Sequence, residues 1–259
     1  MSEKPSSLIN LPEIPPSVDN AVHNLTDKPT LSIATTFSDL WYLVFGGISH
    51  QAKKKEIKYA HDLDVFQQQL ESSINQIPSD KKVEPSIQTT AQALENSKYC
   101  IDQETLREMF VALISNSMNS DYQNNIHPSF AEILKQMSIL DAKIIRLFKD
   151  KNVFPVCQYC LHFSDNALHN TPIPEHIFLD FPDADIMRCS QSLSSLLRLG
   201  LISISYLSTV TEPNAYDKFS QHPFYEDIKQ NFPFKVSISK GAVILTPLGR
   251  SFVEVCISN

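Results

Sequence analysis

The chain has 259 residues, of which 42% are apolar and 20% are charged, a composition typical of a soluble globular protein. Its 22 Lys and Arg residues stand against 29 Asp and Glu residues, and this net charge of -7 argues against a polyanion as the default partner. Only five glycines and 16 dispersed prolines exclude collagen-like, linker-like and glycine-looped phosphate-binding proteins.

The N-terminal segment and the cysteines indicate the kind of compartment. Residues 1–17 contain four prolines and few large apolar side chains, so we expect a flexible lead-in without a signal peptide. Segment 29–48 contains Asp39 and many Ser and Thr residues, which makes it too polar for a stable membrane span. The cysteines are odd in number and scattered, which indicates a reduced, cytoplasmic protein: Cys100, Cys157, Cys160, Cys189 and Cys256.

Residues 18–137 have the periodicity of a helical domain. A first apolar stripe, which we expect to pack in the core, recurs at helical spacings and consists of Phe37, Leu40, Trp41, Val44, Phe45 and Ile48. A second stripe, from Ile57 to Ile77, predicts a long helix that Pro78 stops. Shorter stripes predict helices over 87–94, 106–114 and 130–137, and Pro128 suits the start of the last one.

From Ser138 onward the pattern changes to a mixture of helices and strands. Ser138 and Asp141 have the spacing of a capping box and predict the start of a helix. Short runs rich in β-branched and aromatic residues predict strands near 153–163, 201–206, 235–239 and 242–245. Between the strands we expect a helix over 183–199 that ends at Gly200, and Thr246 opens a final helix.

This order of elements over 138–259 is that of a winged-helix-like domain. The predicted fold class is therefore mostly α, with a helical domain over 18–137 followed by a winged-helix-like α+β domain over 138–259. The stretch Ser208–Pro233 between the expected wing strands is long for a wing, which argues against a simple DNA-reading geometry.

Three segments carry a family resemblance when they are taken together: Phe37–Gly47, Met109–Leu147, and Leu196–Phe252 with its LGLI and LTPLGRSF runs. They resemble the bacterial abortive infection alpha family over residues 18–257. The most specific features are a Ser-Met-Asn turn, a His-Pro-x-Phe helix start and an Asp-Ala pair, which contain Ser117, Asn119, His127, Pro128, Phe130 and Asp141. The resemblance implies antiphage defence by abortive infection. It implies no enzyme activity, and we interpret these residues as structural.

The expected helix over 183–199 offers a candidate contact face. Its predicted outward residues are all polar, and they are Arg188, Gln191, Ser192, Ser195 and Arg198. Residues 138–259 carry 11 Lys and Arg against 12 Asp and Glu, so we expect weak, salt-sensitive nucleic-acid binding at most. A host or phage protein is at least as good a candidate partner.

The cysteine pair Cys157-x-x-Cys160 has three histidines nearby, namely His162, His169 and His176. A structural zinc site needs four converging ligands and usually two such pairs. Because the sequence has no matching second pair, we expect neither a metal nor a cofactor.

A second polar group permits an acid–base hypothesis. His127 is close in sequence to Asn119, Asp121 and Asn125, and Asp141 follows one helix later. We favour capping of helix ends, since no nucleophile with a supporting pair is visible. We therefore expect no catalytic residues.

The sequence supports three hypotheses for the function. The first is a non-enzymatic, cytoplasmic antiphage protein that acts through protein contacts. The second is a nucleic-acid-binding regulator that uses Arg188, Ser195 and Arg198. The third is a membrane-perturbing effector that uses segment Leu31–Ile48. The basic run Lys53–Lys55 could contact an anionic membrane surface, but we favour a solvated helix face. The sequence leaves the oligomeric state, the trigger and the target open.

Overall fold

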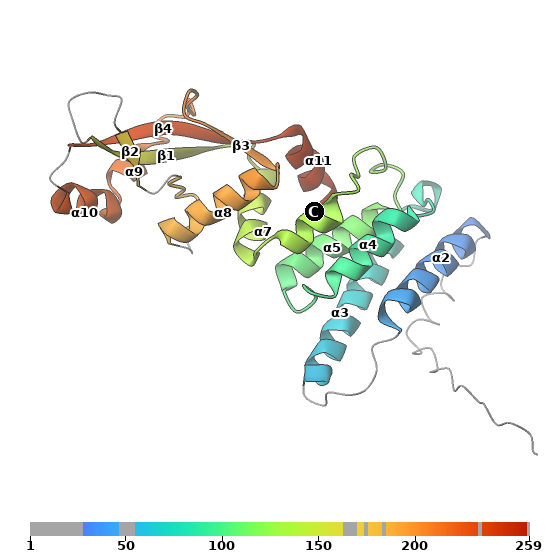
Figure 1. Cartoon of the computed structure of the whole chain (residues 1–259). Helices are drawn as coiled ribbons and strands as arrows, with labels where there is room; N and C mark the ends of the chain where they lie inside the picture. Colours follow the sequence, from blue (N-terminus) through green and yellow to red (C-terminus); the bar gives the residue numbers. More distant parts are fainter. Residues whose placement is uncertain are drawn as a thin grey trace, which may run out of the picture.

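The computed structural model describes residues 28–46, 55–162, 170–173, 176–182, 185–232 and 235–257. The molecule is elongated, with helices gathered at one end and an antiparallel sheet at the other (Figure 1). The predicted mixture of many helices and a few strands is confirmed. The expected lead-in over 1–17 lies outside the described residues.

We call the part of the molecule that contains α2 to α6 the helical end. It consists of α2 (Lys28–Phe45), α3 (Lys55–Asn75), the 3₁₀ turn η1 (Ser79–Lys81), α4 (Ile87–Ser97), α5 (Glu104–Asn116) and α6 (Phe130–Gln136). Helix α2 packs on α4, and α3 packs on α5. The predicted core role of the first apolar stripe is confirmed for Leu40, Trp41, Val44 and Phe45, which are buried, while Ile48 lies outside the described residues.

The aromatic rings show how this core is built. Trp41 of α2 stacks on Phe66 of α3 with ring centroids 5.8 Å apart, and Phe45 follows at 4.5 Å from Trp41. Large side chains at helical spacing therefore close the helical end without strands, as expected for an apolar stripe on each helix.

Two helix starts show how local sequence sets the boundaries. The capping box is confirmed at α7 (Ile139–Arg146), where Ser138 Oγ accepts from Asp141 N and Asp141 Oδ2 accepts from Ser138 N. Helix α6 begins at Phe130, so the start predicted at Pro128 was two residues early. The reason is a tight turn in which Phe130 N donates to His127 O at 3.0 Å.

The sheet end contains four strands in the order β2-β1-β4-β3 with every neighbouring pair antiparallel: β1 (Val153–His162), β2 (Asn170–Pro172), β3 (Ile202–Ser205) and β4 (Lys235–Leu245). Strands β1 and β4 form the long central pair, from Val153 opposite Ile244 to His162 opposite Lys235. The two strands predicted over 235–239 and 242–245 are one strand. Gly241 lies inside this strand. Only a glycine fits there, because a Cβ would lie 2.6 Å from Tyr206 Cδ1.

Helix α8 (Ile186–Arg198) runs along the sheet, and α11 (Pro247–Cys256) returns to the helical end (Figure 1). Gly200 ends α8 with a φ of +74°, the left-handed conformation that its sequence position predicted. Thr246 caps α11 by accepting from Gly249 N at 2.9 Å. Phe252 of α11 then packs edge-to-face on Phe130 of α6, with centroids 5.3 Å apart.

The segment between β3 and β4 is more structured than the predicted loop. It folds into α9 (Asp217–Ser220) and α10 (Pro223–Asn231), which cover one side of the sheet. Tyr159 of β1 donates to Phe219 O of α9 at 2.7 Å and anchors this insertion. The protein therefore has a main core, which extends from α2 to α11, and a second core of buried side chains beneath the insertion.

Candidate functional site

Helix α8 has one face in the core and one face in solvent. Asp185 caps its first turn by accepting from Arg188 N at 3.0 Å. On the inner side, Cys189, Leu193 and Leu196 are completely buried. The outer side repeats every three or four residues and consists of Met187, Arg188, Gln191, Ser194, Leu197 and Arg198. Two of these are large and apolar, since Met187 is 59% and Leu197 is 42% exposed. We call this side the α8 outer face.

The prediction for this face was partly wrong. Arg188, Gln191 and Arg198 are exposed as expected. Ser192, however, is only 4% exposed, because it lies one turn from both Cys189 and Leu196 on the buried side of the helix. Met187 and Leu197 were not predicted on this face, because large apolar residues were expected on the buried side, yet Met187 lies four residues before Gln191 and Leu197 three residues after Ser194.

Ser195 lies at the boundary between the two sides and faces α7. Its hydroxyl donates to Asp141 Oδ2 at 3.0 Å. The same oxygen accepts from Ser138 N in the capping box. Asp141 is 3% exposed, so a buried carboxylate joins the start of α7 to the last turn of α8. Two residues that the sequence placed in separate groups therefore meet.

The two cations of the α8 outer face have different surroundings. Arg198 Nη1 donates to Gln136 Oε1 of α6 at 3.1 Å, which ties the end of α8 to the helical end. Among the described residues Arg188 forms no ion pair. The face thus offers a mixed apolar and polar surface with little concentrated positive charge.

The remaining motif residues hold the turn between α5 and α6. Ser117 is buried, donates to Ile114 O at 2.6 Å and lies 3.2 Å from Thr90 Oγ1. Asn119 Oδ1 accepts from Asp121 N at 3.1 Å. His127 Nδ1 accepts from Ser129 N at 3.2 Å and also lies 2.7 Å from Ser129 Oγ.

Pro128 is exposed in this turn, and Phe130 directly after it is fully buried. The polar groups of the motif have local partners, and its aromatic ring anchors the turn on α11. These contacts agree with a structural role for the motif.

The sequence matches the family described as Abortive infection alpha over residues 58–256, which is most of the chain. The chain belongs to this family. Membership in the abortive infection alpha family suggests a role of the abortive-infection type. The α8 outer face and the motif turn lie inside the matched residues, whereas α2 precedes them. No curated protein and no solved structure matched the chain in the same comparisons.

In this abortive infection alpha protein, the histidine and the aspartate of the acid–base hypothesis, His127 and Asp141, bond to different residues. His127 is exposed and bonds to Ser129, whereas Asp141 is buried between Ser138 and Ser195. No hydrogen bond or ion pair of the described residues joins them, so the geometry offers capping contacts at both positions.

The cysteine pair lies on β1, and burial raises the pKa of the Cys157 and Cys160 thiols. A raised pKa keeps a thiol protonated, which opposes metal binding because the thiolate is the ligand. His162 Nε2 contacts Ser237 Oγ at 2.6 Å, and His176 Nδ1 contacts Tyr206 Oη at 2.8 Å. His169 lies outside the described residues, which contain no group of three or more metal-ligating side chains.

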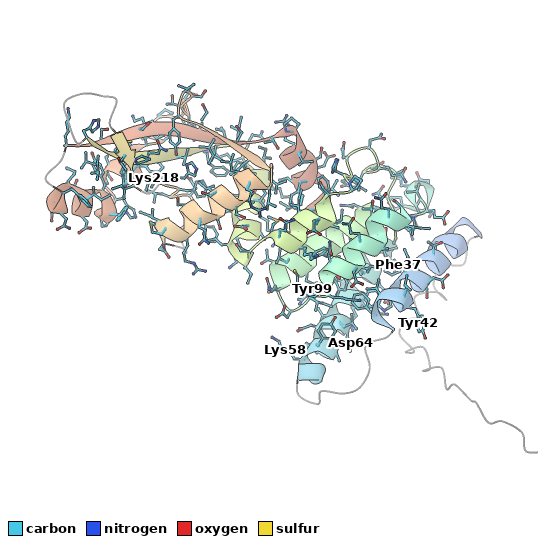
Figure 2. The ribbon with its side chains drawn as sticks, viewed as in Figure 1. Phe37, Tyr42, Lys58, Asp64, Tyr99 and Lys218 are labelled. Atoms are coloured by element: carbon cyan, nitrogen blue, oxygen red, sulfur yellow. The ribbon has the colours of Figure 1, made fainter. Side chains whose placement is uncertain are left out.

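Helix α2 of this family member also bears large exposed apolar side chains. Leu43 is 75% and Tyr42 is 45% exposed. Figure 2 places Tyr42, Tyr99 and Lys58 together at the helical end, with Lys218 at the opposite end of the molecule. In the described part of the chain, no helix combines the length and the apolar character that a membrane crossing requires. Lys53 and Lys54 of the basic run lie outside that part.

Proposed function

We propose that this protein is a non-enzymatic antiphage protein of the cytoplasm that acts by binding another protein through the α8 outer face. The observation that carries the proposal is the exposure of Met187 and Leu197 on a helix whose other side is firmly packed. Protein interfaces combine apolar anchors such as Met with Arg, and both occur here on a rigid element.

The support for this face also comes from how α8 is held. Its inner leucines enter the main core, Ser195 bonds to Asp141 and Arg198 bonds to Gln136. A pre-ordered helix loses little conformational entropy when it binds, which favours affinity. We also propose that residues 138–259 form a winged-helix-like domain. In such a domain α8 would be the helix that contacts a partner, and β3 with β4 would be the hairpin that follows it.

Nucleic-acid binding is the less well supported use of the same helix. Residues 138–259 carry 11 Lys and Arg against 12 Asp and Glu, and Arg198 already bonds to Gln136. Affinity for DNA comes mainly from clustered cations that neutralise phosphates.

A membrane-perturbing action of α2 is also less well supported. The largest side chains of the stripe, Trp41 and Phe45, are buried against Phe66. An interfacial helix needs these side chains for the lipid, and here the core uses them.

The test introduces charges at exposed apolar positions on and away from the α8 outer face, in a bacterial strain in which the wild-type chain limits phage growth. The double variant Met187→Asp with Leu197→Asp places two charges on the α8 outer face. Ile87→Asp is the control, because Ile87 is 62% exposed at the start of α4, away from α8. We expect the double variant to lose protection with an unchanged melting temperature and the control to keep it.

A gel-shift assay separates the nucleic-acid alternative. Nanomolar, sequence-selective binding at physiological salt that disappears in Arg188→Ala with Arg198→Ala would favour a regulator. Full protection by the Met187→Asp, Leu197→Asp variant would remove the α8 outer face from the mechanism.

A further inference from the structure

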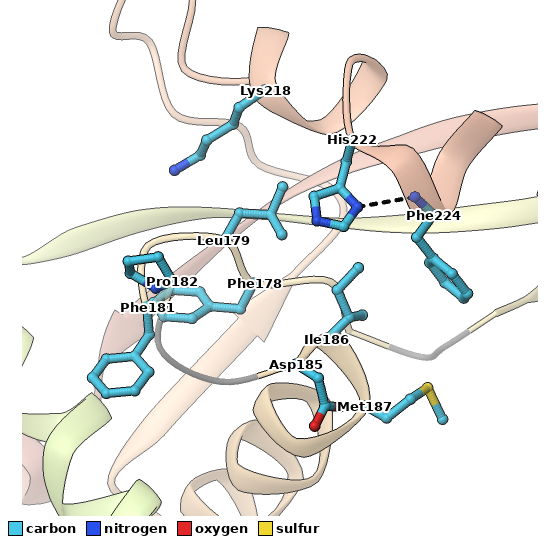
Figure 3. A pocket seen from close by; sticks show the side chains of 10 residues that line it. All are labelled: Phe178, Leu179, Phe181, Pro182, Asp185, Ile186, Met187, Lys218, His222 and Phe224. Carbon is cyan, nitrogen blue, oxygen red and sulfur yellow. Dashed lines mark hydrogen bonds between the residues drawn. The ribbon is translucent and has the colours of Figure 1, made fainter. Parts of the chain in front are cut away.

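The insertion between β3 and β4 forms an open-sided pocket together with segment 176–182 and the start of α8 (Figure 3). Its volume is about 730 Å³, and seven of its ten lining residues are apolar. Sites for small organic ligands typically enclose roughly 300–1,000 Å³ with mostly apolar walls and a few placed polar groups. This pocket is separate from the α8 outer face, although Met187 borders both.

Aromatic and aliphatic side chains from three segments form the pocket floor. Phe178 and Phe181 come from the segment after β2, Ile186 from α8 and Phe224 from α10. Phe178 is fully buried, while the other three are half-exposed and present apolar surface to the cavity. An apolar body of a ligand would therefore be desolvated here.

His222 supplies a directed donor on the α9–α10 side of the pocket. Its Nδ1 accepts from Phe224 N at 3.2 Å, because His222 is the N-cap of α10. A neutral imidazole that accepts at Nδ1 carries its proton on Nε2. Figure 3 shows the ring with its second nitrogen directed over Leu179, into the pocket.

Lys218 supplies the second donor on the same side. Its Nζ binds Asp180 Oδ2 at 2.7 Å and lies 5.6 Å from the centre of the Phe219 ring. An ammonium group has three N–H bonds, so this ion pair leaves further donors available. Lys218 already binds the carboxylate of Asp180 at the rim, so its position suits the binding of a carboxylate.

The carboxylate of Asp185 lies on the opposite side, at the N-cap of α8, where its Oδ1 accepts from Arg188 N. Because Asp180 already pairs with Lys218, an anionic ligand head would bind on that side through the remaining N–H donors of Lys218 and the Nε2 donor of His222, away from Asp185. The two sides give the pocket a direction, with donors at one wall and an acidic group at the other.

We propose that this pocket binds an organic monoanion, with its apolar body against Phe181, Ile186 and Phe224 and its carboxylate or sulfonate head against Lys218 and His222. The inference goes beyond the proposed function, because it does not require the α8 outer face to bind a protein.

The test is a fluorescence titration of the full chain with anilinonaphthalene sulfonate, a monoanion with an aromatic body. N-phenylnaphthylamine, which has the same rings without the sulfonate, is the matched neutral probe. We expect one saturable sulfonate site that Lys218→Met weakens at least about fivefold, since a charge-assisted hydrogen bond is lost. Lys218→Arg should restore binding, and the neutral probe should respond to neither change.

His222→Asn gives a second, structurally mild variant. Asparagine is a good N-cap and can accept from Phe224 N, so it removes the Nε2 donor and keeps the helix start. We expect about threefold weaker sulfonate binding, in line with the loss of one hydrogen bond. Lys229→Met is the control, because Lys229 of α10 pairs with Glu226 and does not line the pocket.

Competition identifies the body of the ligand. Displacement by decanoate at lower concentration than by naphthoate indicates an aliphatic body, and the reverse order indicates an aromatic one. Sulfonate binding that is unchanged in both Lys218→Met and His222→Asn overturns the proposal. An equal loss of the charged and the neutral probe also overturns it, because the donors would then have no role in recognition.

Discussion

The helical end and the sheet end bury their apolar side chains in different ways. At the helical end, α2 to α6 place long stripes of large residues in the main core, and rings such as Trp41 and Phe66 are in direct contact. At the sheet end, a smaller second core lies between the sheet and the insertion, and the pocket opens beside it. The helical end thus supplies a large share of the main core, whereas the two surfaces that we propose for binding, the α8 outer face and the pocket, both belong to the sheet end.

The two parts of the sequence also differ in net charge. Residues 1–137 carry 11 Lys and Arg against 17 Asp and Glu, whereas residues 138–259 are nearly balanced at 11 against 12. A balanced surface repels neither acidic nor basic partners strongly, which suits a contact region.

Two matched phenylalanines test whether the ends are energetically distinct. Phe130 and Phe219 are both fully buried, the first in the main core and the second in the core beneath the insertion. We expect Phe130→Ala to lower the free energy of unfolding by about 3–5 kcal/mol, the usual effect of deleting a core ring. Phe219→Ala should mainly open α9 and α10 locally.

The measurement is urea denaturation followed by Trp41 fluorescence, with hydrogen exchange of the insertion. Trp41 is the only tryptophan and reports on the helical end. If Phe219→Ala lowers the Trp41 transition as much as Phe130→Ala does, the two cores unfold as one unit and the distinction fails.

The contact between Asp141 and Ser195 tests the joint between the ends. Asp141→Ala removes the capping box and leaves Ser195 without its acceptor, so we expect a loss of about 2–3 kcal/mol. Ser195→Ala should lose about 1 kcal/mol, and a double-mutant cycle should show coupling between them. Asp150→Ala, at an exposed position after α7, is the control. Additive losses would show that Asp141 stabilises α7 alone.

Cys157 tests the second core by its response to pH. Burial raises the pKa of this thiol above its ordinary value of 9.0. As the pH rises, the thiol of the unfolded chain therefore loses its proton before the buried thiol does. The buried, protonated thiol contributes its full stabilisation below pH 9.0, and this contribution is lost as the pH rises above that value.

We expect the disadvantage of Cys157→Ala to shrink by about 1–2 kcal/mol between pH 7 and pH 10. Val156→Ala, a buried neighbour on β1 that cannot titrate, should show the same loss at both pH values. A parallel pH response of the two variants would mean that the Cys157 thiol stays protonated in both states.

Asp62 tests the helical end with a substitution that should stabilise the protein. It is 9% exposed on α3, and its Oδ2 has no hydrogen-bond partner in the part of the chain that the structure describes. Because an unsatisfied buried polar atom is destabilising, we expect Asp62→Leu to raise the unfolding free energy by about 1 kcal/mol. Thermal melting checks this against Asp64→Leu, an exposed position on the same helix. A lower melting temperature for Asp62→Leu alone would show that the carboxylate has a stabilising role.

The features that sequence predicts correctly in this protein are local. The box at Ser138 and Asp141, the left-handed Gly200 and the cap at Thr246 each depend on residues within one turn of each other. The stripe around Trp41 is also confirmed, because a helical repeat of large side chains has few alternatives to a core position.

The features that sequence missed depend on contacts between distant segments. The bond from Ser195 to Asp141 spans 54 positions, and no local pattern announces it. The pairing of β1 with β4 likewise joins residues far apart in the chain. The start of α10 was an avoidable omission, since His222 followed by Pro223 is a recognisable cap and first-turn pair.

The return of α11 to the helical end has a consequence for how the protein is made. Phe130 of α6 packs edge-to-face on Phe252, and Asn116 Nδ2 of α5 donates to Val255 O. During translation, the early helices emerge and begin to fold well before residues 247–256 have left the ribosome. The nascent chain therefore carries an open apolar seam along α5 and α6 until almost the whole matched region has been synthesised, and that seam is where a chaperone would be needed.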